Sequence, residues 1–222
     1  MNEVALTHKL NEAADRLMTR GLLQPGSSLS QRLTGKETGR IALLKVDADR
    51  SYSVRLAAVD APASGNLLRW HLAVYQQRRD VGALVLNQQS WALALKELGS
   101  DMPGIFDEQI RHLGSSVKLL ANQAASEEQC ITQCEWLRRG ENAYVLHQNV
   151  LCLGMTLDRV VFNAELLEKC AKAFVLATST GRPVGKIPWL IRYIANGRLM
   201  KDEKYSASQY ARGQVPVFKS AY

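Results

Sequence analysis

The chain has 222 residues, of which 46% are hydrophobic, and a formal net charge of +7 at pH 7. This length fits one globular domain with a sizeable core, and the hydrophobic content excludes an intrinsically disordered chain. The N-terminal residues are polar and periodic, and no apolar stretch is long enough to span a bilayer, so we expect a cytoplasmic protein.

The first third of the sequence predicts a helix followed by three short strands. Leu6, Leu10, Ala14 and Leu17 recur at helical spacing, and Gly21 ends the helix that they form. Strands are predicted at about residues 29–33, 41–46 and 53–59, with turn residues between them.

The next part of the chain alternates helices with strands, as in an α/β domain. Helices are predicted at about residues 67–77, 90–98, 105–113 and 157–178, strands at 83–86 and 117–120, and a hairpin at 144–153. Ser126, followed by Glu127 and Glu128, has the N-cap and first-turn signals of one more helix. These elements predict one domain over residues 1–180.

The last segment, residues 181–222, follows the break at Gly181-Arg182-Pro183 and carries most of the positive charge. It holds eight Lys and Arg residues against Asp202 and Glu203, so 8 minus 2 gives +6. Apolar residues recur among them at helical spacing: Trp189, Leu190, Tyr193 and Ile194. We interpret the segment as a basic helix that packs on the domain or on a neighbouring subunit. An acidic protein partner and, less favoured, nucleic acid or an anionic membrane surface stay open.

The four cysteines are too few and too irregularly spaced for a disulfide framework: Cys130, Cys134, Cys152 and Cys170. Cys130 and Cys134 are spaced to share a helix face, but the sequence around them offers no further zinc ligands. We interpret this pair as buried or half-buried thiols on a core-facing helix.

Residues 70–99 are the most informative part of the chain. A helix with His71, Tyr75, Arg78 and Asp80 leads into an apolar strand that ends in Leu86-Asn87-Gln88. This stretch resembles the core of the class II aldolase/adducin family, in which such a helix feeds a buried strand ending in His-x-His. The family contains sugar-phosphate aldolases, epimerases, dehydratases and adducin heads. The resemblance implies a largely antiparallel central sheet covered by helices, and a homo-oligomer, a tetramer in most relatives, with clefts between subunits.

The resemblance also implies a divalent metal, usually zinc, but its ligands are replaced here. Leu86 and Gln88 stand at the two His-x-His positions, and Gln148 stands at the third histidine, in the segment YVLHQNVLCLG. His147 is one residue early, which in a strand turns its side chain to the opposite face. Leu67 stands where the family has a catalytic Glu. Because leucine and glutamine supply neither zinc ligands nor an acid/base group, we expect no metal, no cofactor and no catalytic residue of the family's kind.

Two loops match the family's phosphate-binding loops in part. The matching residues are Ser27, Ser28, Ser30 and Arg32 after the first helix, and Gly65 and Asn66 before Leu67. They are either a remnant of an anion site or ordinary polar loops. Among the histidines, we expect His71 to pack and hydrogen-bond, and His112 to be exposed.

Three functions follow from these observations. The first is a metal-free, non-catalytic family member with a role in assembly, regulation or ligand sensing, alone or beside a catalytic homologue. The second is a metal-independent enzyme of the lyase or isomerase type that acts on a small sugar or carbonyl compound, with or without a phosphate group. Its candidate acid/base groups are Asp107, Glu108 and Tyr144. The third is a binding module that uses its basic tail for an acidic partner.

Overall fold

The computed structural model describes residues 3–120, 129, 131 and 134–218. Its helices are α1 (Glu3–Thr19), α2 (Asn66–Gln77), α3 (Ser90–Ala94), α4 (Asp107–His112), α6 (Leu157–Ser179) and α7 (Trp189–Ala211), with 3₁₀ turns η1 (Gly35–Glu37), η2 (Leu95–Leu98) and η4 (Cys134–Trp136). Its strands are β1 (Ser28–Arg32), β2 (Arg40–Val46), β3 (Tyr52–Ala58), β4 (Ala83–Asn87), β5 (Met102–Pro103), β6 (Ser116–Leu119), β7 (Ala143–Val145) and β8 (Val150–Gly154). The helix predicted to start at Ser126 and the Cys130–Cys134 pair lie outside the described side chains.

The eight strands of the described residues form one sheet in the order β3-β2-β1-β4-β8-β7-β6-β5. The pairings are antiparallel except that of β6 with β7, which is parallel. The prediction of an α/β fold with a largely antiparallel central sheet flanked by helices is therefore confirmed.

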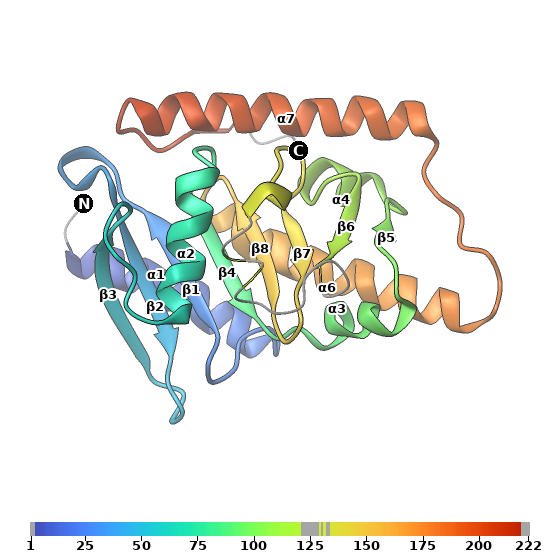
Figure 1. Cartoon of the computed structure of the whole chain (residues 1–222), viewed down its shortest axis with the longest axis horizontal. Coiled ribbons are helices and arrows are strands. Elements are labelled where there is room, and N and C mark those ends of the chain that lie inside the picture. The colour runs from blue at the N-terminus through green and yellow to red at the C-terminus, as the bar shows by residue number, and fades with distance from the viewer. Residues whose placement is uncertain (1–2, 121–128, 130, 132–133, 219–222) are drawn as a thin grey trace.

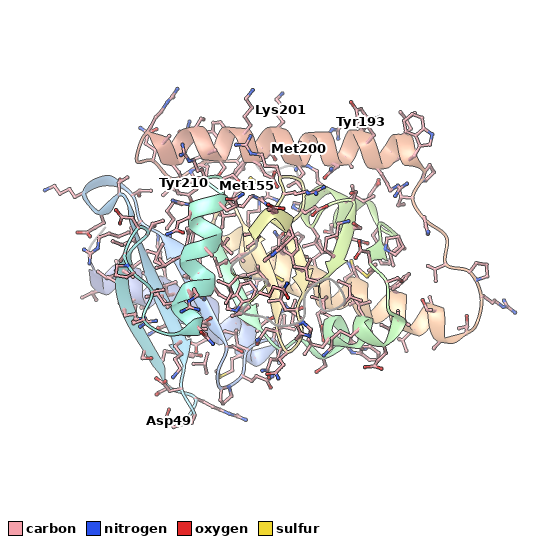
Figure 2. The ribbon with its side chains drawn as sticks, in the orientation of Figure 1. Asp49, Met155, Tyr193, Met200, Lys201 and Tyr210 are labelled. Carbon is pink, nitrogen blue, oxygen red and sulfur yellow. The ribbon has the colours of Figure 1, made fainter. Side chains whose placement is uncertain are left out.

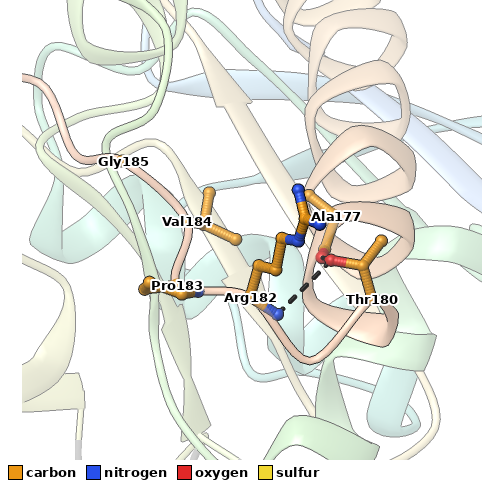
Figure 3. Close-up of a pocket in the computed structure, with 6 residues that line it drawn as sticks. All are labelled: Ala177, Thr180, Arg182, Pro183, Val184 and Gly185. Carbon is orange, nitrogen blue, oxygen red and sulfur yellow. Dashed lines mark hydrogen bonds between the residues drawn. The ribbon is translucent and has the colours of Figure 1, made fainter.

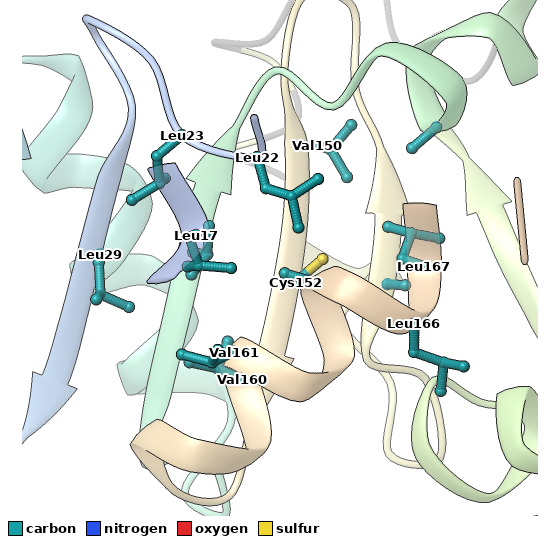
Figure 4. Packing of buried hydrophobic residues seen from close by; sticks show 14 of the residues in the cluster. Leu17, Leu22, Leu23, Leu29, Val150, Cys152, Val160, Val161, Leu166 and Leu167 are labelled. Carbon is teal, nitrogen blue, oxygen red and sulfur yellow. The ribbon is translucent and has the colours of Figure 1, made fainter. Parts of the chain in front are cut away.

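Helices cover both faces of this sheet (Figure 1). On one face, α1, α3 and α6 pack on alternate strand residues such as Val85 and Cys152 (Figure 4). On the other face, α2 packs on the residues between them, such as Leu84 and Leu86. Because successive side chains of a strand point to opposite faces, a strand buried on both faces is apolar throughout. Cys152 and Cys170 are buried free thiols.

The second half of the sheet departs from the prediction in small ways. The helix expected at 90–98 is a short α3 followed by the 3₁₀ turn η2, which ends at Gly99 in the left-handed conformation with φ of 66°. Met102 and Pro103, between the helices predicted at 90–98 and 105–113, form the two-residue strand β5, paired with β6. Pro103 is compatible with this pairing because β5 is an edge strand, where a missing backbone N–H leaves no neighbour unsatisfied.

Helix α7 runs along one end of the sheet, and a loop connects it to α6 (Figure 1). Its buried residues, Leu199, Glu203, Ser206 and Tyr210, share one helix face. Tyr210 lies beside Met155, whereas Tyr193 and Lys201 point away from the sheet (Figure 2). Helix α7 thus packs on its own domain through its second half. Among the described helices, none combines the length and apolar character that crossing a bilayer requires.

Candidate functional site

The strand register brings the three positions that the family resemblance matches to metal ligands to the same end of the sheet: Leu86, Gln88 and Gln148. Leu86 of β4 pairs with Ser28 of β1 on one side and with Leu151 of β8 on the other. Gln88 directly follows β4, and Gln148 lies in the turn between β7 and β8. Side chains at the end of β4 and in the turn before β8 can therefore converge, because these two strands are neighbours in the sheet.

The side chains on this frame do not fit a divalent metal. Leu86 is buried in the cluster under α2 and has no donor atom. Gln88 is exposed, and its Oε1 accepts a hydrogen bond of 2.7 Å from Gln24 Nε2. Zinc prefers imidazole, thiolate or carboxylate ligands. Across the described residues, no three His, Cys, Asp or Glu side chains gather into a possible metal site.

Helix α2 carries Leu67, the position that the family resemblance matches to an acid/base Glu. Leu67 lies in its first turn, half-buried against the cluster that contains Leu86. Gly65 precedes the helix with φ of 85°, a backbone conformation that strongly favours glycine. Gly65 and Asn66 are both exposed. A leucine at this position packs and cannot transfer a proton.

The polar side chains at the start of β1 take part in a buried hydrogen-bond network with α2. Ser28 Oγ lies 2.8 Å from His71 Nε2, and Ser30 Oγ lies 2.6 Å from His71 Nδ1 and 2.9 Å from the Tyr75 hydroxyl. Burial, with a smaller contribution from the charge of Arg55, lowers the pKa of His71 to about 3. The neutral imidazole therefore donates to one serine and accepts from the other. His71 packs and hydrogen-bonds, as expected.

Arg32 and Ser27, which the resemblance also matches to the phosphate loop, form hydrogen bonds within the chain. Arg32 donates from Nε to the carbonyl of Val81 at 2.9 Å and from Nη2 to the carbonyl of Tyr75 at 3.0 Å. Ser27 Oγ accepts from the backbone N–H of Gln24 at 3.1 Å. Anion binding by these loops stays a prediction, and it would require some of these bonds to be exchanged.

Comparison with known proteins identifies the family. The family model described as the Class II Aldolase and Adducin N-terminal domain matches residues 35–175. The chain belongs to the class II aldolase and adducin family. No curated protein sequence is significantly similar to it.

Solved structures of the same fold are similar over most of the chain. Escherichia coli YgbL has 17% identity and a TM-score of 0.71, covering 86% of this chain and 98% of its own. An L-fuculose 1-phosphate aldolase has 18% identity and a TM-score of 0.71, covering 89% and 97%. The L-fuculose-1-phosphate aldolase of Thermus thermophilus has 20% identity and a TM-score of 0.64, covering 82% and 97%. At these identities the likeness shows the fold alone.

Beside this family frame lies a buried ion cluster that the sequence revealed only in part. Arg78 donates from Nε and Nη2 to the two carboxylate oxygens of Asp80 at 2.9 and 2.8 Å. Its Nη2 also lies 3.2 Å from Glu203 Oε1 and 2.9 Å from Asn142 Oδ1. Glu203 Oε2 accepts from the backbone N–H of Gly140 at 2.7 Å. The side chains of Arg78 and Asp80 are 2% exposed and that of Glu203 is 0% exposed.

One guanidinium thus faces two carboxylates in this cluster. Burial lowers the pKa of Arg78, but the hydrogen bond and charge of Asp80 outweigh it, and the net shift is upward. Burial raises the pKa of Glu203 to about 7, against the opposing effect of Arg78. Asp80 makes two hydrogen bonds with the guanidinium, whereas Glu203 makes a single, longer contact with it. The sequence signal for Glu203 was present: an acidic residue on a basic helix, in phase with Leu199, Ser206 and Tyr210.

The other residues considered for chemistry do not come together. Tyr144 is buried under α2, and its hydroxyl donates to the carbonyl of Glu141 at 3.0 Å. Glu108 instead pairs with Lys169 of α6 at 3.6 Å, and Asp107 is exposed. The expectation that His112 is exposed is wrong, because Phe162 packs on its ring with centroids 4.9 Å apart. Burial, then the charges of two arginines, lowers its pKa to about 4.

Proposed function

We propose that this chain is a family member that does not perform the metal-dependent chemistry and serves in assembly, regulation or ligand sensing. The replacement of the acid/base and metal positions by Leu67, Leu86, Gln88 and Gln148 on an intact backbone frame carries this proposal. A small side-chain rearrangement does not rebuild a zinc site there, because one position is a buried leucine. We further propose a cytoplasmic location.

A homo-oligomer is part of the proposal. The first turns of α7 expose a group of large apolar side chains: Trp189, Leu190, Ile191, Tyr193 and Ile194. Trp189 is 71% and Tyr193 is 74% exposed, which is unusual for aromatic residues of an isolated domain. A second copy of this chain, or a catalytic homologue of the same fold, would cover this group.

Metal content tests the first part of the proposal. Elemental analysis of protein purified without a chelator or an affinity metal should find far less than one equivalent of zinc, manganese or iron per chain. The matched variant restores imidazoles by the substitutions Leu86→His, Gln88→His and Gln148→His, and it should gain zinc. In its control the third imidazole is left out (Leu86→His with Gln88→His), so that only two ligands remain and zinc binding should weaken.

Near-stoichiometric metal in the unmodified protein would contradict the proposal. Sedimentation equilibrium tests the oligomer in parallel: the chain should associate, and Trp189→Ser combined with Tyr193→Ser should weaken association. A monomer at every concentration would refute assembly as the role.

A second candidate function rests on the exposed basic residues of α7. Arg198, Lys201 and Lys204 are exposed in the same helix as the apolar group. They would support binding of an acidic protein, and such binding should weaken as salt screens the charges. Binding that is insensitive to salt would argue against it.

A further inference from the structure

A cavity of about 1100 Å³ lies on the face of the sheet that α1 and α6 cover. Its walls come from α1, from the end of β1, from α4, from the first turns of α6, and from residues 215–218. Gln31 of β1 pairs with Ala83, at the opposite end of β4 from Gln88. Its side chain points away from α2, because its neighbour Ser30 bonds to α2 and strand side chains alternate between faces. The cavity is therefore separate from the positions that the resemblance matches to metal ligands.

The cavity offers apolar surface to a ligand. Aliphatic and aromatic side chains reach it from several of these segments: Leu6, Leu33, Val161, Phe162, Val217 and Phe218. Small-molecule sites are clefts of about 300–1,000 Å³ with apolar walls and a few polar groups that orient the ligand. The size of this cavity and the apolar side chains in its walls fit such a site.

Three arginines of the walls are bonded within the chain. Arg16 donates to both carboxylate oxygens of Glu165 at 2.7 and 2.8 Å, and Arg111 pairs with Asp202. Arg32 donates to two backbone carbonyls at 2.9 and 3.0 Å. A charged ligand would have to compete with these partners, whereas an uncharged ligand leaves them in place.

Gln31 gives the cavity a polar atom that the chain does not satisfy. Its Oε1 is shielded from solvent and has no hydrogen-bond partner among the described residues. Buried polar atoms in folded proteins nearly always have a partner. A hydroxyl or amide N–H on a bound molecule would supply one.

The tail, residues 215–218, forms one wall and belongs to no helix or strand. Pro216 is buried, and the ring centre of Phe218 lies 5.8 Å from that of Tyr205 in α7 and 5.6 Å from the guanidinium carbon of Arg159 in α6. Packing on α6 and α7 thus holds this wall in place around a ligand.

We propose that this cavity binds a small uncharged organic molecule with an apolar body and a hydroxyl or amide group. The donor of that group bonds to Gln31 Oε1, and the body lies against α6 and the tail. The proposal is independent of whether the family's chemistry is absent, since none of Leu86, Gln88 and Gln148 lines the cavity.

Calorimetric titration of the full chain with three probes tests it: p-propylphenol, propylbenzene and p-propylbenzoate. The phenol should bind saturably, and the benzoate should bind no more tightly than the phenol. Gln31→Leu should weaken binding of the phenol about fivefold, since a hydrogen bond contributes about 1 kcal/mol and 1.4 kcal/mol is tenfold. The same variant should bind propylbenzene, which has no donor, as tightly as before or more tightly. Gln24→Leu, the same substitution on an exposed side chain outside the cavity, is the matched control and should change none of the three affinities.

A second cavity, of about 680 Å³, lies between the end of α6 and the loop that follows it (Figure 3). Val184→Ser in its wall should leave all three affinities unchanged. Loss of binding in this variant would place the probes in the second cavity and would overturn the proposal.

Nuclear magnetic resonance of the imidazole carbons locates the bound phenol without any substitution. The chain has four histidines, of which His112 lines the cavity, so its signal should move while those of His8, His71 and His147 stay in place. An unmoved His112 signal at saturation overturns the proposal. So does tighter binding of the benzoate than of the phenol, or a Gln31→Leu variant that binds the phenol as before or weakens phenol and propylbenzene equally.

Discussion

We predict that replacing the buried Glu203 carboxylate, which faces Arg78, stabilises the protein above neutral pH. Its carboxylate lies 3.2 Å from Arg78, which looks like a stabilising buried salt bridge. However, Arg78 is already paired through two hydrogen bonds with Asp80, and burial raises the pKa of Glu203 from 4.5 to about 7. The cluster therefore favours the protonated form of Glu203.

The sign follows from proton linkage. Between about pH 4.5 and about pH 7 the folded state keeps a proton on Glu203 that the unfolded state has lost, so the free energy of unfolding falls as the pH rises. A shift of about 2.5 units at 1.36 kcal/mol per unit gives about 3 kcal/mol in all, most of it between about pH 5 and about pH 8. Glu203→Gln mimics the protonated side chain at every pH. Its free energy of unfolding should match that of the unmodified protein at about pH 4 and exceed it by about 3 kcal/mol at about pH 8.

Urea unfolding of the two proteins across this pH range is the assay. The difference between them is the quantity to compare, because the neutral buried histidines His71 and His112 affect both curves equally and act in the opposite direction below pH 6.5. Glu97→Gln, on an exposed side chain with the same change of charge, is the control and should show no such pH trend. A Glu203→Gln protein that is several kcal/mol less stable at about pH 8 would refute the reasoning, since it would mean that Glu203 is ionised and its pair with Arg78 is net stabilising.

Three further predictions use the same unfolding measurement. Arg78→Met leaves the charge of Asp80 buried without its cation and should destabilise by about 3–5 kcal/mol; a loss below about 1 kcal/mol would contradict this. Gly82→Ala drives a methyl group into the Tyr210 hydroxyl and the Met155 carbonyl and should destabilise by at least about 1–3 kcal/mol, whereas Gly185→Ala, with open space around it, should be neutral. His71→Phe leaves the Ser28 hydroxyl without its hydrogen-bond partner and should lower the free energy of unfolding by about 1–3 kcal/mol at pH 7. Below pH 6.5 the unmodified protein should lose about 1.4 kcal/mol of stability per pH unit, because its unfolded state protonates this histidine and its folded state does not. The His71→Phe variant should lack that loss. If the His71 variant lost stability below pH 6.5 as steeply as the unmodified protein, the folded state would not be holding His71 neutral.

The sequence alone determined where most helices and strands lie and to which fold class the chain belongs. Helical and alternating periodicity located α1, α2, α6 and the strands β1 to β4 within a few residues, because each of these elements buries a regular pattern of apolar side chains. The family resemblance was readable from the motif around His71, because that motif lies within one helix–strand unit. Short elements such as β5 were not readable, because two residues carry no periodicity.

The tertiary structure alone decided which distant residues meet. Glu203 reaches Arg78 across 125 positions of sequence. Its phase with Leu199 and Tyr210 places it on their helix face, but that phase does not tell which part of the domain this face meets. His112 was expected on an exposed face, but Phe162 and Arg159 of α6 cover it. The cavity that His112 lines is formed by segments from both ends of the chain, from Leu6 to Phe218. Burial and the resulting pKa shifts depend on these long-range contacts, and periodicity within one segment reports only which face of that segment is apolar.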